Sequence, residues 1–281
     1  ISVTGVQTCA LPICLRLQDV DHQLADRRRH GRVGQTRWWC DPRLHPRERH
    51  GRAVGAEDRR QVLAARVHHG RDRDGQGVCA RYWYIAFDGA EFEDFSTPFG
   101  VANMDSGTLS HGRIQAAMAK SGVLTDSEFK LVHDDPPIYG YVDAMIVWND
   151  EEIVGEIKTT NNDSFEYRKK VGKPKTDHVE QVLIYMKLLG KQKGLIIYEN
   201  KNNHDLLLFP LEVNDIYRAW IDKTFNWLRE VRQTWKDRNL PIKTYRSNAK
   251  VCKTCPVRKA CDEAGDGVIK ILPLEGLSEI V

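Results

Sequence analysis

Two acidic residues in the middle of the chain lie on neighbouring segments that are expected to be strands. Asp143 belongs to an apolar run, Ile138–Trp148, and Glu156 belongs to a second run, Ile153–Thr159. Both runs are rich in β-branched and aromatic residues, which favours strands. The polar segment Asn149–Glu152 between them is short enough for a hairpin turn. Asp143 and Glu156 are therefore predicted to come from adjacent strands.

Lys158 completes a group of charges that suits a divalent cation. Side chains alternate along a strand, so Glu156 and Lys158 point to one face while Ile157 points into the core. Two neighbouring carboxylates raise each other's pKa, and a cation between them removes that repulsion. Oxygen ligands suit Mg²⁺ or Mn²⁺, which would lower the pKa of a bound water and neutralise charge on a phosphate. Lys158 would orient that water or stabilise the transition state.

Four further polar residues lie on predicted helices and strands. His111 is in a helical pattern, where a lone histidine is more often a surface or capping residue. Gln181 and Tyr185 are four residues apart on a helix that starts near Asp177, so both reach one face. From the residues alone, Tyr185 is a half-buried packing residue. Glu128 is expected on the surface of a strand, with a role behind the metal ligands as the alternative.

The order of these polar residues along the chain resembles the PD-(D/E)xK nuclease superfamily. It is similar to the RecB-like exonuclease branch, which includes the CRISPR-associated iron–sulfur nucleases and their phage relatives. The residues that carry the resemblance are His111, Asp143, Glu156, Lys158, Gln181 and Tyr185. The resemblance implies an α/β fold with a restriction-endonuclease-like αβββαβ core, in which helices flank a mixed sheet. It also implies metal-dependent hydrolysis of DNA.

The same resemblance implies a role for each matching position. The residues implied to hold Mg²⁺ or Mn²⁺ are His111, Asp143, Glu156 and Ile157. The residues implied to act in catalysis are Asp143, Glu156, Lys158, Gln181 and Tyr185. Within that set, Gln181 and Tyr185 are expected to contact the DNA backbone or Lys158.

A compact group of cysteines predicts a second metal site. Cys252, Cys255 and Cys261 supply three thiolates, which leaves a soft metal unsatisfied. Cys79 is the candidate fourth ligand, because Cys79–Tyr84 resembles the Cys-x-Arg-x-x-Tyr-like segment of the iron–sulfur members of this branch. Four cysteines suit a 4Fe–4S cluster; zinc is the main alternative, and free thiols are the third. A disulfide framework is not expected, because we find no secretory signal or membrane-spanning run and expect a cytoplasmic protein.

The first part of the chain differs from the rest in composition. Residues 3–13, VTGVQTCALPI, resemble the translation of a sequencing-adapter oligonucleotide. Residues 1–78 contain fifteen Arg, no Lys and nine acidic residues, a net charge of +6, whereas residues 79–281 have a net charge of −3. We therefore expect residues 1–76 to be an artefactual, frame-shifted or disordered segment, and residues 77–281 to be the nuclease domain. A basic arm that binds nucleic acid is the competing explanation.

The remaining segments complete one α/β domain of ordinary size. Gly194–Asn200 and Leu206–Val213 are predicted strands, and Asn214–Trp235 is a predicted helix whose aromatic stripe is expected in the core. Asn161–Lys175 is polar and basic, and is expected to be a substrate loop or a solvated linker. Val268–Val281 is expected to be a peripheral tail.

These patterns favour a metal-dependent DNA exonuclease that acts in recombination, repair or the processing of CRISPR or phage DNA. The expected partner is DNA, single-stranded or with a free end. Recombination or CRISPR adaptation proteins are further candidates, and no membrane partner is expected. An endonuclease of the same superfamily is one alternative, and a catalytically silent DNA-binding subunit is another. The complete set of Asp143, Glu156 and Lys158 argues against the silent subunit.

Overall fold

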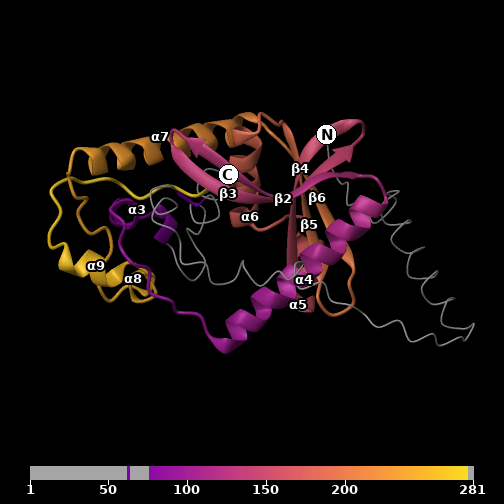
Figure 1. The fold of residues 1–281 in the computed structure, drawn as a ribbon, viewed down its shortest axis with the longest axis horizontal. Coiled ribbons are helices and arrows are strands. Elements are labelled where there is room, and N and C mark those ends of the chain that lie inside the picture. Colours follow the sequence, from indigo (N-terminus) through magenta and orange to yellow (C-terminus); the bar gives the residue numbers. More distant parts are fainter. Residues whose placement is uncertain (1–61, 64–75, 278–281) are drawn as a thin grey trace, which may run out of the picture.

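A computed structural model describes Val62–Leu63 and residues 76–277 of the chain. The adapter-like residues 3–13 and nearly all of residues 1–76 lie outside the described residues, so the expectations for that segment stay predictions. Within the described part, helices cover a mixed β-sheet from both faces (Figure 1).

From residue 76 onward, groups of helices and groups of strands follow one another along the chain. The helices are η4, a 3₁₀ turn (Gln76–Val78), α3 (Ala80–Phe87), α4 (Pro98–Lys120), α5 (Asn162–Val171), α6 (Thr176–Leu188), α7 (Asp215–Lys236), α8 (Lys250–Lys253) and α9 (Arg258–Glu263). The strands are β1 (Val62–Leu63), β2 (Leu124–Asp134), β3 (Pro137–Trp148), β4 (Glu151–Thr160), β5 (Lys193–Asn200) and β6 (Leu206–Glu212).

The sheet combines antiparallel hairpins with one parallel crossover. Its order is β1-β3-β4-β5-β6, and β2 also pairs with β3. The pairs β2–β3, β3–β4 and β5–β6 are antiparallel, whereas β4 and β5 are parallel. Parallel neighbours need a long connection, which α5 and α6 provide here. This mixed α/β sheet flanked by helices confirms the fold class predicted from the sequence.

Two apolar clusters fill the two faces of the sheet. On β5, Leu195 and Ile197 belong to the cluster under α4, whereas Ile196 and Tyr198 belong to the cluster under α6. Because neighbouring strand residues point to opposite faces, the two clusters lie on opposite sides of the sheet. The larger cluster continues into α3 and α7, which lie away from α4 in Figure 1. The buried aromatic stripe of α7, with Trp220 at 1% exposure, confirms its predicted place in the core.

The hairpin between β3 and β4 is tighter than the sequence predicted. Asn149 and Asp150 alone form the turn, and β4 already begins at Glu151. Both turn residues have positive φ, 50° and 60°, the left-handed conformation that a two-residue hairpin of this twist requires. Asn and Asp adopt this conformation more readily than other residues that have a side chain. The turn therefore fixes the register in which β3 meets β4.

The two strands of this hairpin separate at the predicted catalytic residues. Their pairing runs from Trp148 and Glu151 to Ala144 and Gly155, and their recorded pairing ends there. Asp143 is the next residue of β3 toward its N-terminal end. A gap between β3 and β4 therefore opens where the acidic side chains lie.

β1 pairs with the part of β3 that β4 has left. Val62 and Leu63 are parallel to Ile138 and Tyr139, while β2 occupies the other edge of β3 along its length. The sequence predicted no strand before residue 77, because two apolar residues within a strongly charged segment show no periodicity. This short strand is a difference from that prediction, and the residues around it lie outside the described ranges.

Residues 161–175 were expected to be a loop or a linker, and this expectation was wrong. Most of the segment forms α5, which Asn161 caps by accepting the N–H of Ser164 at 2.9 Å. Gly172 ends the helix in the left-handed conformation, at φ 66°. Phe165 is the one buried residue of α5, at 2% exposure. A single apolar anchor gives no helical periodicity, so the pattern hid the helix.

The C-terminal segment is also not peripheral, contrary to expectation. Ile271, Leu274 and Leu277 are buried at 4–5% exposure and join the larger core cluster. The indole N–H of Trp227 donates a hydrogen bond to the carbonyl of Leu272 at 2.8 Å. These apolar residues are spaced too irregularly to resemble a helix or a strand, so no pattern predicted their packing.

α6 approaches β3 closely because Gly140 has no side chain. A Cβ atom at Gly140 would lie 2.5 Å from Cε1 of Tyr185 and 2.7 Å from its hydroxyl oxygen. Tyr185 is 1% exposed and lies in the larger core cluster, so it has little room to move aside.

We expect Gly140→Ala to lower the free energy of unfolding by about 1–3 kcal/mol, because the added methyl group overpacks the contact with Tyr185. Gly112→Ala is the matched control, since no atom lies within 4 Å of a Cβ added there. In helix α4 that change should leave stability unchanged or raise it by up to about 1 kcal/mol. Chemical denaturation measures both variants, and equal stabilities would contradict the close contact.

Candidate active site

The gap between β3 and β4 is bridged by a carboxylate. Asp143 is 8% exposed, and its Oδ2 accepts the backbone N–H of Ile157 at 2.8 Å. In a strand the N–H and C=O of one residue point to the same edge, so the carbonyl oxygen of Ile157 also faces this gap. The Ile157 side chain is buried in the cluster under α4, as the alternation of the strand predicted. Only its carbonyl oxygen can therefore contribute to a metal site.

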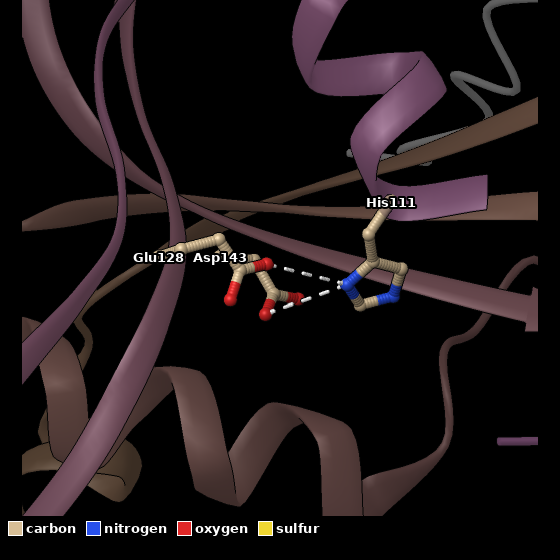
Figure 2. A group of neighbouring side chains, drawn as sticks. All are labelled: His111, Glu128 and Asp143. Carbon is tan, nitrogen blue, oxygen red and sulfur yellow. Dashed lines mark ion pairs between the residues drawn. The ribbon is translucent and has the colours of Figure 1, made fainter. Parts of the chain in front are cut away.

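Two side chains, His111 and Glu128, converge beside Asp143 (Figure 2). His111 Nδ1 lies 3.7 Å from Asp143 Oδ1 and 3.9 Å from Glu128 Oε1. One ligand atom from each of the three residues lies within 4.8 Å of the other two. One imidazole nitrogen and two carboxylate oxygens suit Mn²⁺ or Mg²⁺. The structure thus brings His111 to Asp143, and adds Glu128, for which the sequence favoured the surface over a role behind the metal ligands.

Glu128 reaches this group through an unusual backbone conformation. Its φ is 54°, although it lies inside β2, and its neighbours Ser127 and Phe129 keep the regular antiparallel register. A residue with a side chain pays about 1–2 kcal/mol for the left-handed region. Such strained residues occur most often at functional sites. No sequence pattern predicts a left-handed glutamate within a strand, so Glu128 could not have been chosen from the sequence.

Gln115 holds the two carboxylate-bearing strands in place. Its amide nitrogen donates to Glu128 Oε1 at 2.9 Å and to the backbone carbonyl of Asp143 at 2.8 Å. Gln115 is 9% exposed and lies one helical turn after His111 on α4. The same helix face therefore supplies one possible metal ligand and the amide that fixes two others. The spacing of four residues from His111 was the one signal in the sequence that could have pointed to it.

Glu156 and Lys158 form an ion pair on the other side of the gap. Glu156 is fully buried, and its Oε2 has no hydrogen-bond partner among the described residues. Burial, followed by the charge of Asp143, raises the pKa of Glu156 to about 7. Burial alone would lower the pKa of Lys158, but Glu156 and Asp143 raise it above its ordinary value. An unpartnered buried carboxylate oxygen beside a second acid is the arrangement that a metal cation completes.

Asp143 and His111 also favour their protonated forms. Burial raises the pKa of Asp143, which outweighs the opposing charges of Lys158 and His111. Burial would lower the pKa of His111, but the carboxylates of Glu128 and Asp143 raise it above its ordinary value. Protons therefore compensate the negative charge as long as no cation does.

Gln181 and Tyr185 belong to α6, which covers the face of the sheet opposite α4. Gln181 Nε2 donates to the Tyr185 hydroxyl oxygen at 3.3 Å, and the two residues are 6% and 1% exposed. Burial, then the charge of Glu156, raises the pKa of Tyr185, so the phenol stays protonated. The pair is thus packed under the acidic residues, which matches the packing role that the residues alone predicted for Tyr185.

The four predicted cysteine ligands gather at the other end of the domain, where α3, α8 and α9 meet (Figure 1). All four are free thiols. Burial, with a smaller contribution from the neighbouring thiols of Cys252 and Cys261, raises the pKa of Cys79 to about 11 and that of Cys255 to about 12. Among the described residues, no three of these sulfur atoms lie within 4.8 Å of one another. The structure thus brings the four thiols into one region of the domain.

No protein-family profile matches the chain, and no curated protein is similar to it in sequence. Among solved structures, the chain resembles LHK-Exo in complex with dAMP, with 18% identity and a TM-score of 0.51 over 65% of this chain and 93% of that one. A second structure, an alkaline exonuclease (LHK-Exo) from Laribacter hongkongensis, has 16% identity and a TM-score of 0.50 over 64% and 91%. These likenesses show a shared fold.

Within the described residues, no helix combines the length and the apolar character that a membrane crossing requires.

Glu128→Gly is expected to lower the affinity for metal and to raise the stability of the metal-free protein. Glycine adopts φ near 54° at no steric cost, so the metal-free variant should gain up to about 1–2 kcal/mol in the free energy of unfolding. Loss of the carboxylate should weaken Mn²⁺ binding, measured by titration calorimetry. Glu128→Gln is the control, because it keeps the strained backbone and should lose affinity without gaining stability. Mn²⁺ binding by Glu128→Gly as tight as that of the parent protein would exclude Glu128 as a ligand.

The stability of the metal-free protein should fall as pH rises through neutrality. Glu156, Asp143 and His111 all have raised pKa values in the fold, and such groups contribute stability at low pH that is lost as pH rises through the folded-state pKa. For Glu156 that window runs from 4.5 to about 7. After EDTA treatment, the melting temperature should therefore be lower at pH 8 than at pH 5, and Mn²⁺ should restore more of it at pH 8. A metal-free melting temperature that rises across this range would contradict the assignment.

Proposed function

We propose that the chain is a metal-dependent deoxyribonuclease that hydrolyses phosphodiester bonds from a free DNA end. The observation that carries the proposal is the unpartnered, fully buried Oε2 of Glu156, which lies beside Asp143 and Lys158 in the gap between β3 and β4. Burying such charges is costly unless a cation compensates them. The likeness of the fold to an alkaline exonuclease supports the reaction class, and the dAMP bound to that protein supports a deoxynucleotide substrate.

Five groups are the proposed ligands of the cation. They are the side chains of His111, Glu128 and Asp143, which lie together, the side chain of Glu156 on the other side of the gap, and the carbonyl oxygen of Ile157. Bound Mg²⁺ or Mn²⁺ would lower the pKa of a water molecule and neutralise charge on the scissile phosphate. Asp143 is central, because it lies between the His111–Glu128 side and the Glu156–Lys158 side.

Lys158 serves the reaction as a charge and not as a base. The carboxylates of Glu156 and Asp143 raise its pKa, so it stays protonated at physiological pH. A fixed ammonium can orient the attacking water and stabilise the negative charge that develops on the phosphate. Gln181 and Tyr185, on α6, position the acidic residues. The ring of Tyr185 contacts Gly140 and lies close to Glu156 and Asp143.

DNA would reach this centre across α5 and its connection to α6. This stretch follows β4 directly and carries a concentration of basic residues, namely Arg168, Lys169, Lys170, Lys173 and Lys175. Tyr167 lies among them with 55% exposure and offers a ring on which a base can stack. Lysine and arginine contacts to phosphates supply most of the affinity of proteins for single-stranded DNA. The recombination, phage and CRISPR contexts, with their protein partners and a cytoplasmic location, rest on the sequence resemblance alone.

We further propose a metal at the four cysteines. Cys79, Cys252, Cys255 and Cys261 supply the thiolates that both a 4Fe–4S cluster and zinc require. Four thiolates fit either metal, and analysis for iron, sulfide and zinc distinguishes them. Such a centre would join α3, near the start of the described domain, to α8 and α9 near its end.

Nuclease activity is tested with the full chain on end-labelled linear DNA and on closed circular DNA. We expect cleavage of linear DNA that requires Mg²⁺ or Mn²⁺, and a loss of at least about 10²-fold for Asp143→Asn and for Lys158→Ala. Lys158→Ala should still bind Mn²⁺, since lysine is not a ligand. Lys193→Ala is the matched control, because Lys193 pairs with Glu151 at the exposed end of the hairpin.

The outcomes separate the three functions. Circular DNA cut as fast as linear DNA would favour the endonuclease. Metal-dependent DNA binding without any cleavage would favour the silent subunit. DNA cleavage by Asp143→Asn at the rate of the parent protein would contradict the proposed metal centre.

A further inference from the structure

Arg81 places a positive charge inside the domain, next to the cysteines. It is the second residue of α3 and is 1% exposed. A guanidinium group is always protonated in proteins. Moving it out of water costs several kcal/mol unless a negative charge lies nearby. The surroundings of Arg81 should therefore contain a compensating charge.

The hydrogen bonds of Arg81 satisfy its donors but do not balance its charge. Nη1 donates to the carbonyl of Pro241 at 2.8 Å, and Nη2 donates to the carbonyls of Cys261, at 2.9 Å, and Gly265. Nε donates to the Sγ atom of Cys261 at 3.1 Å. Carbonyl groups carry no net charge, so Cys261 Sγ is the only contacted atom that can become an anion.

No carboxylate in residues 76–277 forms an ion pair with Arg81. The two fully buried glutamates show the usual arrangement, since Glu156 pairs with Lys158 and Glu199 with Arg113. Arg81 is the opposite case: within residues 76–277 it is a buried cation that contacts carbonyl groups and a thiol but no carboxylate. Its position therefore favours negative charge on the cysteines.

Metal binding would supply that charge. Four thiolates carry twice the charge of a divalent ion, so a four-cysteine metal centre is negative overall. Hydrogen bonds and charges next to such a centre tune its stability and its reduction potential. The N–H of Arg81 that points to Cys261 Sγ is placed to do both.

We propose that Arg81 is the counter-ion of a negatively charged metal–thiolate centre formed by Cys79, Cys252, Cys255 and Cys261. It acts as a positioning residue that raises the affinity of the thiolates for metal. Where the metal is a 4Fe–4S cluster, Arg81 also stabilises the more negative, reduced form and so raises the reduction potential. The proposal rests on the metal proposed at the cysteines and is independent of nuclease activity, so its test needs no DNA.

Metal retention by the full chain, purified without oxygen, gives the first measurement. Iron, sulfide and zinc are quantified, and metal loss to a competing chelator is followed in the parent protein, Arg81→Lys and Arg81→Gln. Arg81→Gln should weaken metal binding by roughly 10–100-fold, and Arg81→Lys, which keeps the charge, by much less. Arg238→Gln is the control, because Arg238 is exposed and pairs with Asp88. A parent protein without bound metal, or equal losses for Lys and Gln, would overturn the proposal.

Melting temperatures separate charge compensation from a purely structural role. In the metal-loaded protein, Arg81→Gln should lower the melting temperature. In metal-free protein it should have a smaller effect or raise the melting temperature, because it removes an unbalanced buried charge. If Arg81 only bound the carbonyls of Pro241 and Gly265, Arg81→Gln would lower the melting temperature equally in both forms. That result would refute the proposal.

If Arg81→Gln does not fold, Arg81→Lys tests the proposal instead. It keeps the charge but lacks the planar fork, so it should retain metal while losing stability in both forms. Metal loss by Arg81→Lys as complete as that of Cys261→Ser would overturn the proposal.

Discussion

The burial of like charges between β3 and β4 is the constraint on which the rest of the site depends. Asp143 and Glu156 lie where the pairing of these strands ends, and each raises the energy of the other's ionised form. Because β3 and β4 are consecutive in the sequence, the hairpin between them brings the two carboxylates together. The surrounding elements then compensate it, with Lys158 from β4 and His111 from α4. The chemistry of the site follows from the same imbalance, because a divalent cation relieves it best.

The support for this group comes from both faces of the sheet. On one face, α4 is fixed by Arg113, which pairs with the fully buried Glu199 of β5 two residues along the helix from His111. His204 Nδ1 lies 2.8 Å from the same glutamate oxygen. On the other face, α6 presses Tyr185 against Gly140. The acidic group is thus held between two helices whose positions are fixed by an ion pair and by a close packing contact.

The sequence predicted those parts of the site whose positions depend on local strand patterns. Asp143, Glu156 and Lys158 lie on strands with clear apolar alternation, so their meeting followed from one hairpin. Glu128 escaped prediction because its place depends on a left-handed backbone and on an amide from a distant helix. α5 and the C-terminal segment were misjudged for a different reason. Each is attached by a few separate apolar side chains, and such anchors leave no periodic signal.

The two ends of the domain carry opposite charge imbalances. In the β3–β4 gap, negative charge exceeds its partners, whereas at the cysteines the buried cation Arg81 contacts no carboxylate among residues 76–277. A bound metal would correct both, by adding positive charge in the first place and by turning thiols into thiolates in the second. Metal binding would then be part of the free energy of folding at each end. Since α3 joins the cysteines to the larger core cluster, which reaches α6 on the side of the acidic group, both proposed metals would stabilise one common core.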